Sequence, residues 1–247
     1  PAVYAQTLIS ANGPTQSYGG GATVVSGYTA NQATNSVILL ALAFDTNLSG
    51  ASATFGGVAM TLLASDTRTA IYGLANPGAS SGDIVLNTGA GAANTIVTYG
   101  TLTGVDTGSF PLSSANGSSS FVANTATMSS SLTGLSDGDF VLSVFNRNSF
   151  FGFSAISGGS LSTLNSYNGA DAGPYSGGIF GGNISSGDLT GGAFIPSMTF
   201  TGGTDGSSAT FASAVAFTAV PEPASLGLVF GVVVLGCVAV YRRQKSA

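Results

Sequence analysis

The sequence predicts an all-β protein, a glycine-rich β-sandwich followed by a single C-terminal transmembrane helix. Short apolar, β-branched runs recur along the chain, and clusters of Gly, Ser, Asn and Asp separate them, which is typical of a sandwich or barrel. Residues 224–241 carry no charge, and these 18 residues at ~1.5 Å each just cross a ~30 Å hydrocarbon layer. We therefore expect one sandwich over residues 6–219 and a membrane helix after it.

Charge is sparse throughout the chain, at 6% Asp, Glu, Lys and Arg, against about 25% in an average globular domain. Before Pro221 there are nine aspartates and only two cations, Arg68 and Arg147, which gives a net charge of −7. Nucleic acid is excluded as a partner, because phosphate binding needs clustered Lys and Arg. The only cysteine, Cys237, lies in the apolar run, so packing alone must stabilise the sandwich.

The first strong strand is predicted at Ser36–Phe44, a continuous apolar run. Its length and the breakers on both sides favour a central strand over a helix. Further strands are expected at 53–55 and 58–63, joined as a hairpin by Gly56-Gly57, and then at 69–74, 83–87 and 94–102.

The second half of the chain has weaker patterns. Residues 113–120 are rich in Ser, Asn and Gly, and form either a loop or a weak boundary between halves. A strong strand is predicted at 138–145, entered through a turn at 136–138, and the last strand at 207–219. Between 152 and 192, Gly and Ser interrupt nearly every run, so short strands and long loops are expected. No repeat of 20–50 residues is visible, which argues against a solenoid or propeller.

Four segments together resemble the jelly-roll-like β-sandwich domains of bacterial surface proteins. They are Ala53-Thr-Phe-Gly-Gly-Val-Ala-Met-Thr61, Ile71-Tyr-Gly-Leu-Ala-Asn-Pro77, Gly104-Val-Asp106 and Gly138-Asp-Phe-Val-Leu142. This resemblance implies a fold and brings no agreed activity with it.

The last 28 residues combine three features in order. Val220-Pro221-Glu222-Pro223 is followed by the apolar run 224–241 and by a basic end, 242–247, with Arg242, Arg243 and Lys245. Basic residues after a membrane helix hold that end in the cytoplasm. The whole segment resembles the PEP-CTERM sorting signal, in which Pro221, Glu222, Pro223, Arg242 and Arg243 would serve sorting and processing. A simple tail anchor, with the prolines merely marking the helix start, is the alternative.

The sorting-signal resemblance implies a location and partners. The protein would be exported to the cell surface or extracellular matrix of a Gram-negative-type bacterium. It would be anchored in the bacterial membrane until an exosortase-type enzyme processes it, and such proteins are often associated with exopolysaccharide. Residues 1–5 contain Val3-Tyr4-Ala5, a small-x-small pattern that fits the remnant of a signal peptide, although an ordinary extended N-terminus fits nearly as well.

The sequence contains few of the residues that common catalytic sites need. The chain has no His, and its one Lys, Lys245, follows the membrane run, so a serine nucleophile would lack a base. Asp106-Thr107-Gly108-Ser109 resembles the active-site loop of aspartic proteases, but that chemistry needs a second, convergent carboxylate. The alternative is an ordinary β-turn.

No cofactor is expected, and metal sites are limited to calcium. Zinc and copper are excluded, because the chain offers no His and no available Cys. Asp137 and Asp139 are weak calcium candidates, and turn geometry is the more favoured explanation for both.

A candidate ligand edge lies in residues 146–153, which we predict to be a loop. It comprises Arg147, Phe150, Phe151 and Phe153. The alternative is that these phenylalanines pack beneath the loop.

The favoured function is an exported, non-catalytic structural protein of the cell surface or biofilm matrix that self-associates through β edges. Ser36–Phe44 and 207–219 contain no charge and no Pro, and either would make an unguarded edge. Residues 6–10 would supply the added strand. The alternative is that loops or the sandwich itself cover both edges. An extracellular polysaccharide-binding module is the second hypothesis, and a hydrolase a distant third.

Overall fold

The computed structural model describes residues 16–18, 22–30, 35–45, 47, 50–88, 93–111, 113–119, 125–147, 153–157, 161–167, 176–201 and 210–220. Within these ranges it contains nineteen strands and one short 3-10 helix, Ser186–Asp188, so the predicted all-β class is confirmed. No helix of the described residues is long and apolar enough to cross a membrane. The helix predicted at 224–241 and the possible signal remnant at 1–5 lie outside these residues.

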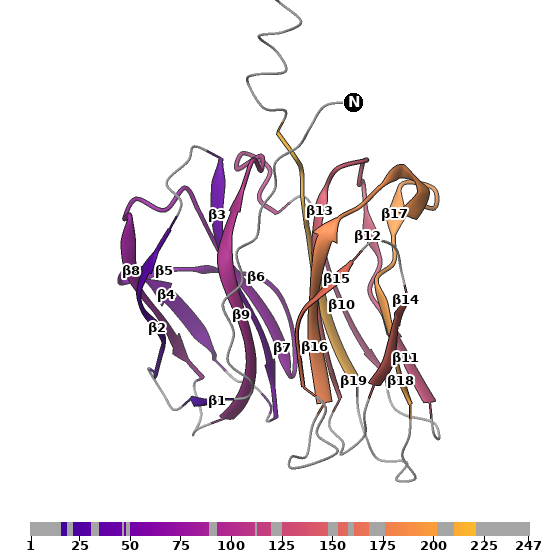
Figure 1. The fold of residues 1–247 in the computed structure, drawn as a ribbon, viewed down its shortest axis with the longest axis horizontal. Helices are drawn as coiled ribbons and strands as arrows, with labels where there is room; N and C mark the ends of the chain where they lie inside the picture. Colours follow the sequence, from indigo (N-terminus) through magenta and orange to yellow (C-terminus); the bar gives the residue numbers. More distant parts are fainter. Residues whose placement is uncertain are drawn as a thin grey trace, which may run out of the picture.

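The first half of the chain forms two antiparallel sheets (Figure 1). The first inner sheet has the order β1-β9-β3-β7-β6, and the first outer sheet has the order β2-β8-β4-β5. Their strands are β1 (Gln16–Tyr18), β2 (Ala22–Thr29), β3 (Ser36–Phe44), β4 (Ser52–Phe55), β5 (Val58–Ala59), β6 (Thr61–Asp66), β7 (Thr69–Ala75), β8 (Ser81–Asn87) and β9 (Ala93–Thr103).

The second half forms a second inner sheet, in the order β10-β19-β13-β16-β15, and a second outer layer made of β11-β18-β14 and the pair β12-β17. The strands are β10 (Ser113–Ser119), β11 (Thr125–Ser129), β12 (Leu132–Thr133), β13 (Phe140–Arg147), β14 (Phe153–Ser157), β15 (Ser162–Tyr167), β16 (Ser176–Asn183), β17 (Ala193–Phe194), β18 (Ser197–Thr201) and β19 (Thr210–Phe217).

The sheets stack as four layers, with the two inner sheets in the middle (Figure 1). Three buried apolar clusters fill the three spaces between the layers. The structure thus divides the single sandwich expected over 6–219 into two sandwiches packed face to face. The low-complexity segment that we considered a weak boundary begins the second sandwich, as strand β10.

Strand β3 shows why the stack has four layers. Its even-numbered side chains, from Ile38 to Phe44, pack toward the first outer sheet, and its odd-numbered ones, from Val37 to Ala43, pack toward the second half. Every residue of β3 is buried, and so is every residue of β13. A strand that is apolar on both faces needs a packing partner on each side, which a single two-layer sandwich supplies on one side only.

The two halves share one topology. If β1, β2, β3, β4, β6, β7, β8 and β9 are matched in order with β10, β11, β13, β14, β15, β16, β18 and β19, the sheet orders coincide. The register coincides as well: Tyr72 and Gly73 pair with Leu40 and Leu39, and Phe180 and Gly181 pair with Ser143 and Leu142. The repeat is about a hundred residues long, far above the 20–50 residues considered in the sequence.

Each half also carries the same packing device at its edge strand. The register of β6 shifts between Leu62 and Ala64, and that of β15 shifts between Thr163 and Asn165. Each shift leaves one leucine over a glycine of the neighbouring strand. A Cβ on Gly73 would lie 2.8 Å from Leu63 Cδ1, and a Cβ on Gly181 would lie 2.9 Å from Leu164 Cδ1. The absence of a side chain at these glycines is therefore what admits the leucines.

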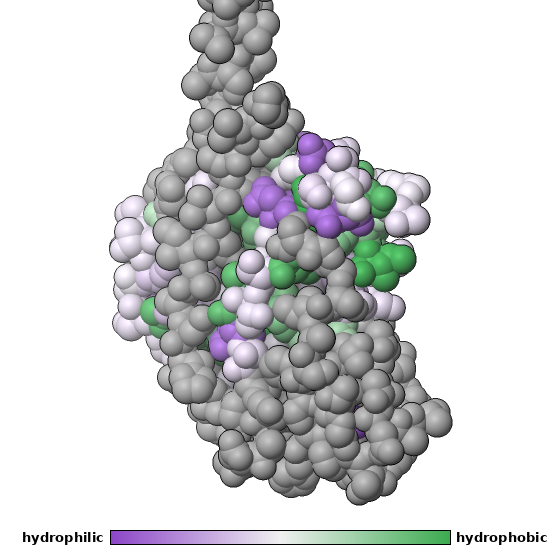
Figure 2. Space-filling view, turned by 45° about the vertical axis from the view of Figure 1, so that its right-hand side comes forward, coloured by the Kyte–Doolittle hydropathy of each residue, from purple (hydrophilic) through white to green (hydrophobic). Residues whose placement is uncertain are grey.

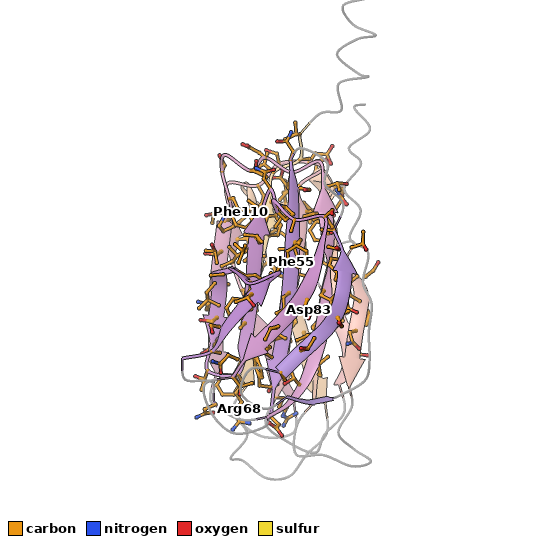
Figure 3. All side chains as sticks on the ribbon, turned by 90° about the vertical axis from the view of Figure 1, so that its left-hand side faces the viewer. Phe55, Arg68, Asp83 and Phe110 are labelled. Carbon is orange, nitrogen blue, oxygen red and sulfur yellow. The ribbon has the colours of Figure 1, made fainter. Side chains whose placement is uncertain are left out.

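The two sandwiches are joined by apolar packing, with specific side-chain contacts toward both ends. The Phe110 and Phe217 rings stack at 5.9 Å. The Thr69 and Ser213 hydroxyls are hydrogen-bonded at 2.7 Å in a buried position. The Arg68 guanidinium lies 5.8 Å from the centre of the Phe211 ring. Arg68 and Phe110 lie toward opposite ends of the molecule (Figure 3), so these contacts brace the interface along its length.

We expect Gly73→Ala and Gly181→Ala each to lower the free energy of unfolding by about 1–3 kcal/mol. The new methyl group overpacks the neighbouring leucine and phenylalanine, which are Leu63 and Phe110 at Gly73 and Leu164 and Phe140 at Gly181. Gly78→Ala is the matched control, since nothing lies within 4 Å of its added Cβ and its φ is ordinary. Urea unfolding of the three variants measures the effect. Equal stability of all three would contradict the proposed packing device.

Candidate functional site

The two segments predicted to be unguarded edges are both interior strands, so that prediction is wrong. Strand β3 lies between β9 and β7, and β19 lies between β10 and β13. Strands β3 and β19 lack charged residues and Pro because they are buried on both faces and paired on both sides. Residues 6–10, expected to supply an added strand, lie outside the described residues.

The real edges of the four larger sheets belong to eight other strands. They are β1 and β6, β2 and β5, β10 and β15, and β11 and β14. None of them contains Lys, Arg or Pro, and Asp66 is the only charged residue among them. Apart from Asp66 at the end of β6, the charges and prolines that usually discourage edge-to-edge pairing are therefore missing from these strands.

The edges differ in regularity. Strands β2, β6, β14 and β15 have register shifts, which twist an edge away from a partner. Strands β1 and β5 have only three and two residues. Strand β10 pairs with β19 over seven residues without any shift, and β11 pairs with β18 over five. Strand β10 is thus the longest regular edge, and Ser114 and Asn116 on it are exposed.

A pocket of about 180 Å³ opens on the first inner sheet, at the edge formed by β6 and β7. Two cross-strand pairs, Leu62 with Tyr72 and Ser65 with Ala70, line its floor. The remaining lining residues are Gly50, Ala51 and Asp66. Tyr72 is buried, at 2% exposure, and burial raises its pKa to about 12, so its hydroxyl keeps its proton at neutral pH.

Sequence reasoning missed this pocket, because its residues were considered only as strand residues. The one available signal was a tyrosine inside an otherwise apolar run, with Ser65 and Asp66 on the preceding strand. Pairing of these strands could be anticipated from the sequence, but the loop that closes the pocket at Gly50 and Ala51 could not.

Both calcium candidates, Asp137 and Asp139, accept backbone N–H groups, and Asp139 does so within the turn that was the alternative explanation. Asp139 accepts the Ser136 N–H at Oδ2 (2.8 Å) and the Ala219 N–H at Oδ1 (3.3 Å). Asp137 accepts the Ser186 N–H at Oδ1 (3.1 Å). N–H dipoles directed at a carboxylate compete with a cation, and the described residues contain no group of three or more His, Cys, Asp or Glu that could hold a metal ion.

Asp106 occupies a turn as well. Its Oδ1 accepts the Gly108 N–H at 2.9 Å, and Asn76 Nδ2 donates to the Thr107 hydroxyl at 2.9 Å. This is the local side-chain bonding that favours Asp in turns. The loop that resembles a protease site therefore has a complete structural explanation.

The candidate ligand edge is corrected by the position of Arg147. Asn146 and Arg147 belong to β13 and are fully buried, whereas the prediction placed them in an exposed loop. Asn146 Nδ2 donates to the Phe44 carbonyl at 2.8 Å across the interface between sandwiches. Phe150 and Phe151 lie outside the described residues. Phe153 is the first residue of β14, and only its backbone is described.

The sorting residues Pro221, Glu222, Pro223, Arg242 and Arg243 also lie outside the described residues, but the chain just before them is held in place. Thr218 O accepts the Asp106 N–H and Gly104 O accepts the Val220 N–H, both at 2.8 Å. Since Ala219 is bound to Asp139, residues of both sandwiches fix the point where the tail leaves (Figure 1).

On the coloured part of the face in Figure 2, hydrophobic and hydrophilic residues alternate in small areas. The exposed large hydrophobic side chains of the described residues are Val58, Leu62 and Ile195. None of the described Tyr or Phe side chains is fully exposed. The described surface therefore shows no row of aromatics on which a sugar chain would stack.

A scan against protein-family models found no match for this chain, and a search of curated proteins found none either. Among solved structures, one chain of a structure described as the complete structure of a manganese lipoxygenase of Gaeumannomyces graminis and a partial structure of a zonadhesin of Komagataella pastoris is similar. The identity is 13% and the TM-score 0.15, over 87% of this chain and 78% of that one. Infectious bursal virus T=1 particles are similar at 15% identity and a TM-score of 0.15, over 88% of this chain and 41% of that one. TM-scores this low support no argument about fold or function.

The stability of the protein should carry a pH dependence from Asp139. Burial raises the pKa of this carboxyl, and the hydrogen bonds from Ser136 and Ala219 offset the rise only in part. The folded protein thus binds this proton more tightly than the unfolded chain does. The contribution of Asp139 is fully present below the unfolded pKa of about 3.9 and is lost as pH rises through the folded pKa.

Urea unfolding at a series of pH values, with Asp139→Asn as reference, isolates this contribution. We expect the stability of the wild-type protein relative to the variant to fall as pH rises above about 4. A difference that is constant across this range would show that Asp139 has an ordinary pKa.

Proposed function

We propose that this chain is an exported, non-catalytic structural protein of a bacterial cell surface or biofilm matrix, which associates with other copies through its sheet edges. The observation that carries the proposal is the set of eight edge strands without Lys, Arg or Pro. Unpaired N–H and C=O groups on such edges accept a further strand by main-chain hydrogen bonding. Strand β10, long, regular and uncharged, is the edge that we expect to be used.

Export and anchoring by the tail belong to the same proposal. Its support is the order of Pro221-Glu222-Pro223, an uncharged run and a basic end. The fixed exit point at Val220 adds to it, because a processing enzyme then meets the motif just beyond a rigid body. We also propose that each sandwich is jelly-roll-like. Numbered within each half, the inner sheet has the strand order 1-8-3-6-5 and the outer sheet has 2-7-4. Apart from strand 5, which extends the inner sheet, this is the order that two nested Greek keys produce.

A non-catalytic role is supported by the way the carboxylates are used. The chain has no His, and Asp106, Asp137 and Asp139 each accept backbone N–H groups. A hydrolase would need two carboxylates converging on one cleft or a base beside a nucleophile.

Self-association is tested by placing Lys on β10. In Ser114→Lys/Asn116→Lys, two charges would have to be buried against an incoming strand, so we expect self-association to weaken at least about tenfold, roughly 1.4 kcal/mol. Light scattering over a concentration series and electron micrographs of the purified protein measure this.

Ser80→Lys/Ser131→Lys is the matched control, because it adds the same charge at exposed positions outside the edge strands. This control should assemble as the wild-type protein does. Wild-type protein that stays monomeric at high concentration, with and without calcium, would rule out association through edges.

Processing of the tail is tested with Glu222→Ala and Pro223→Ala. If a sorting enzyme recognises the motif, both variants should accumulate unprocessed in the membrane, whereas a simple anchor would be insensitive to them. Intact mass of surface-extracted protein distinguishes the two. A wild-type product that still carries residues 241–247 would contradict processing.

A further inference from the structure

The pocket on the first inner sheet is lined by Tyr72, whose side chain carries a hydroxyl group. The Tyr72 side chain is 2% exposed and lines the pocket, and its hydroxyl forms no hydrogen bond within the described part of the chain. Because Tyr72 lines the pocket, a ligand or water there can complete the hydrogen bonding of its hydroxyl.

The second sandwich shows that the fold does not need this hydroxyl. Phe180 occupies the position equivalent to Tyr72, in the same register of the matching strand, and is fully buried. The cross-strand neighbours match too: Ser65 pairs with Ala70, and Ser166 pairs with Gly178. An aromatic ring is thus what packing requires at this position, and the hydroxyl is particular to the first sandwich.

The groups around the pocket define the chemistry of its occupant. The Tyr72 hydroxyl donates, the Ser65 hydroxyl donates or accepts, and the Asp66 carboxylate accepts. Leu62, 47% exposed, and Ala70 provide apolar surface beside them. The combination suits a ring with hydroxyl groups on its rim and C–H groups on its face.

The volume of the pocket and the charges that line it restrict the class of ligand further. The volume of about 180 Å³ is below the ~300–1,000 Å³ of pockets for drug-sized ligands, so the occupant is one small ring. Asp66 disfavours an anion, and neither Lys nor Arg lines the pocket.

We propose that this pocket binds a single neutral sugar residue, at the end or on a branch of a polysaccharide, with Tyr72, Ser65 and Asp66 as its polar contacts. The site lies at the β6 edge, on the face of the first inner sheet that is turned toward the first outer sheet, whereas β10 packs near β6 from the second sandwich. It deepens the proposed matrix function by giving the protein a polysaccharide contact, but it does not depend on self-association.

Saturation-transfer NMR on the full chain tests the proposal. The probes are glucose, galactose, mannose and N-acetylglucosamine, with glucuronic acid as the charged comparison, all at millimolar concentrations. We expect at least one neutral sugar to bind and to shift the amide signals of Gly50, Ala51 and Ser65. Tyr72→Phe and Ser65→Ala should each weaken that binding about three- to tenfold, as the loss of one hydrogen bond does.

Tyr99→Phe is the matched control, because Tyr99 flanks Leu40 on the opposite side from Tyr72 and does not line the pocket. It should bind as the wild-type protein does. Since Phe180 already occupies the equivalent position, Tyr72→Phe should fold normally, and circular dichroism checks this. The proposal is overturned if no neutral sugar binds, if Tyr72→Phe and Ser65→Ala bind with unchanged affinity, or if glucuronic acid binds more tightly than every neutral sugar. Failure of self-association in the β10 variants would leave these results unaffected, so the two proposals fail separately.

Discussion

The burial of both faces of strands β3 and β13 is the constraint on which the rest of the structure depends. Val37, Leu39 and Ala41 share one apolar cluster with Leu142 and Val144, and the opposite faces of the two strands belong to the outer clusters. Apolar burial stabilises by roughly 25 cal/mol per Å², and this chain has no disulfide and few charges to add to it. The structure has four layers because each of these inner strands needs a packing partner on both of its apolar faces.

The two sandwiches meet through equivalent faces of equivalent sheets, as two subunits do in an isologous dimer. Their shared devices are those of packing: the register shift in the edge strand, the leucine over a glycine, and the aromatic ring at Tyr72 and Phe180. Their differences are polar. The Tyr72 hydroxyl and the Arg68 contact with Phe211 have no counterpart at equivalent positions, where Phe180 and Ser176 stand. The two sandwiches therefore share the apolar packing that the fold requires and differ in the polar groups that it does not require.

The low charge of the chain bears on both its stability and its sheet edges. With few charged groups to solvate, the described chain folds without desolvating many ions, and its sheet edges keep main-chain groups available to neighbours. The exit of the tail is held by Gly104 and Asp106 from one sandwich and Asp139 from the other, so the two-sandwich body ends at a defined point before the motif. For the proposed association at a surface, such rigidity would lower the conformational entropy lost on binding.

The sequence by itself determined the fold class and the principal strands. An uncharged run such as Ser36–Phe44, and the breakers around it, reflect local burial, which depends on the side chains of that segment. The turn bonds of Asp106 to Gly108 and of Asp139 to Ser136 could be anticipated for the same local reason, whereas the bond of Asp137 to Ser186 joins distant parts of the chain. Tertiary structure alone decided which strands are edges, that there are two sandwiches, that Arg147 is buried, and that Gly50, Ser65 and Tyr72 meet at one pocket. These outcomes depend on partners distant in the chain, and an apolar run has the same appearance whether its second face meets solvent, another sheet or another copy.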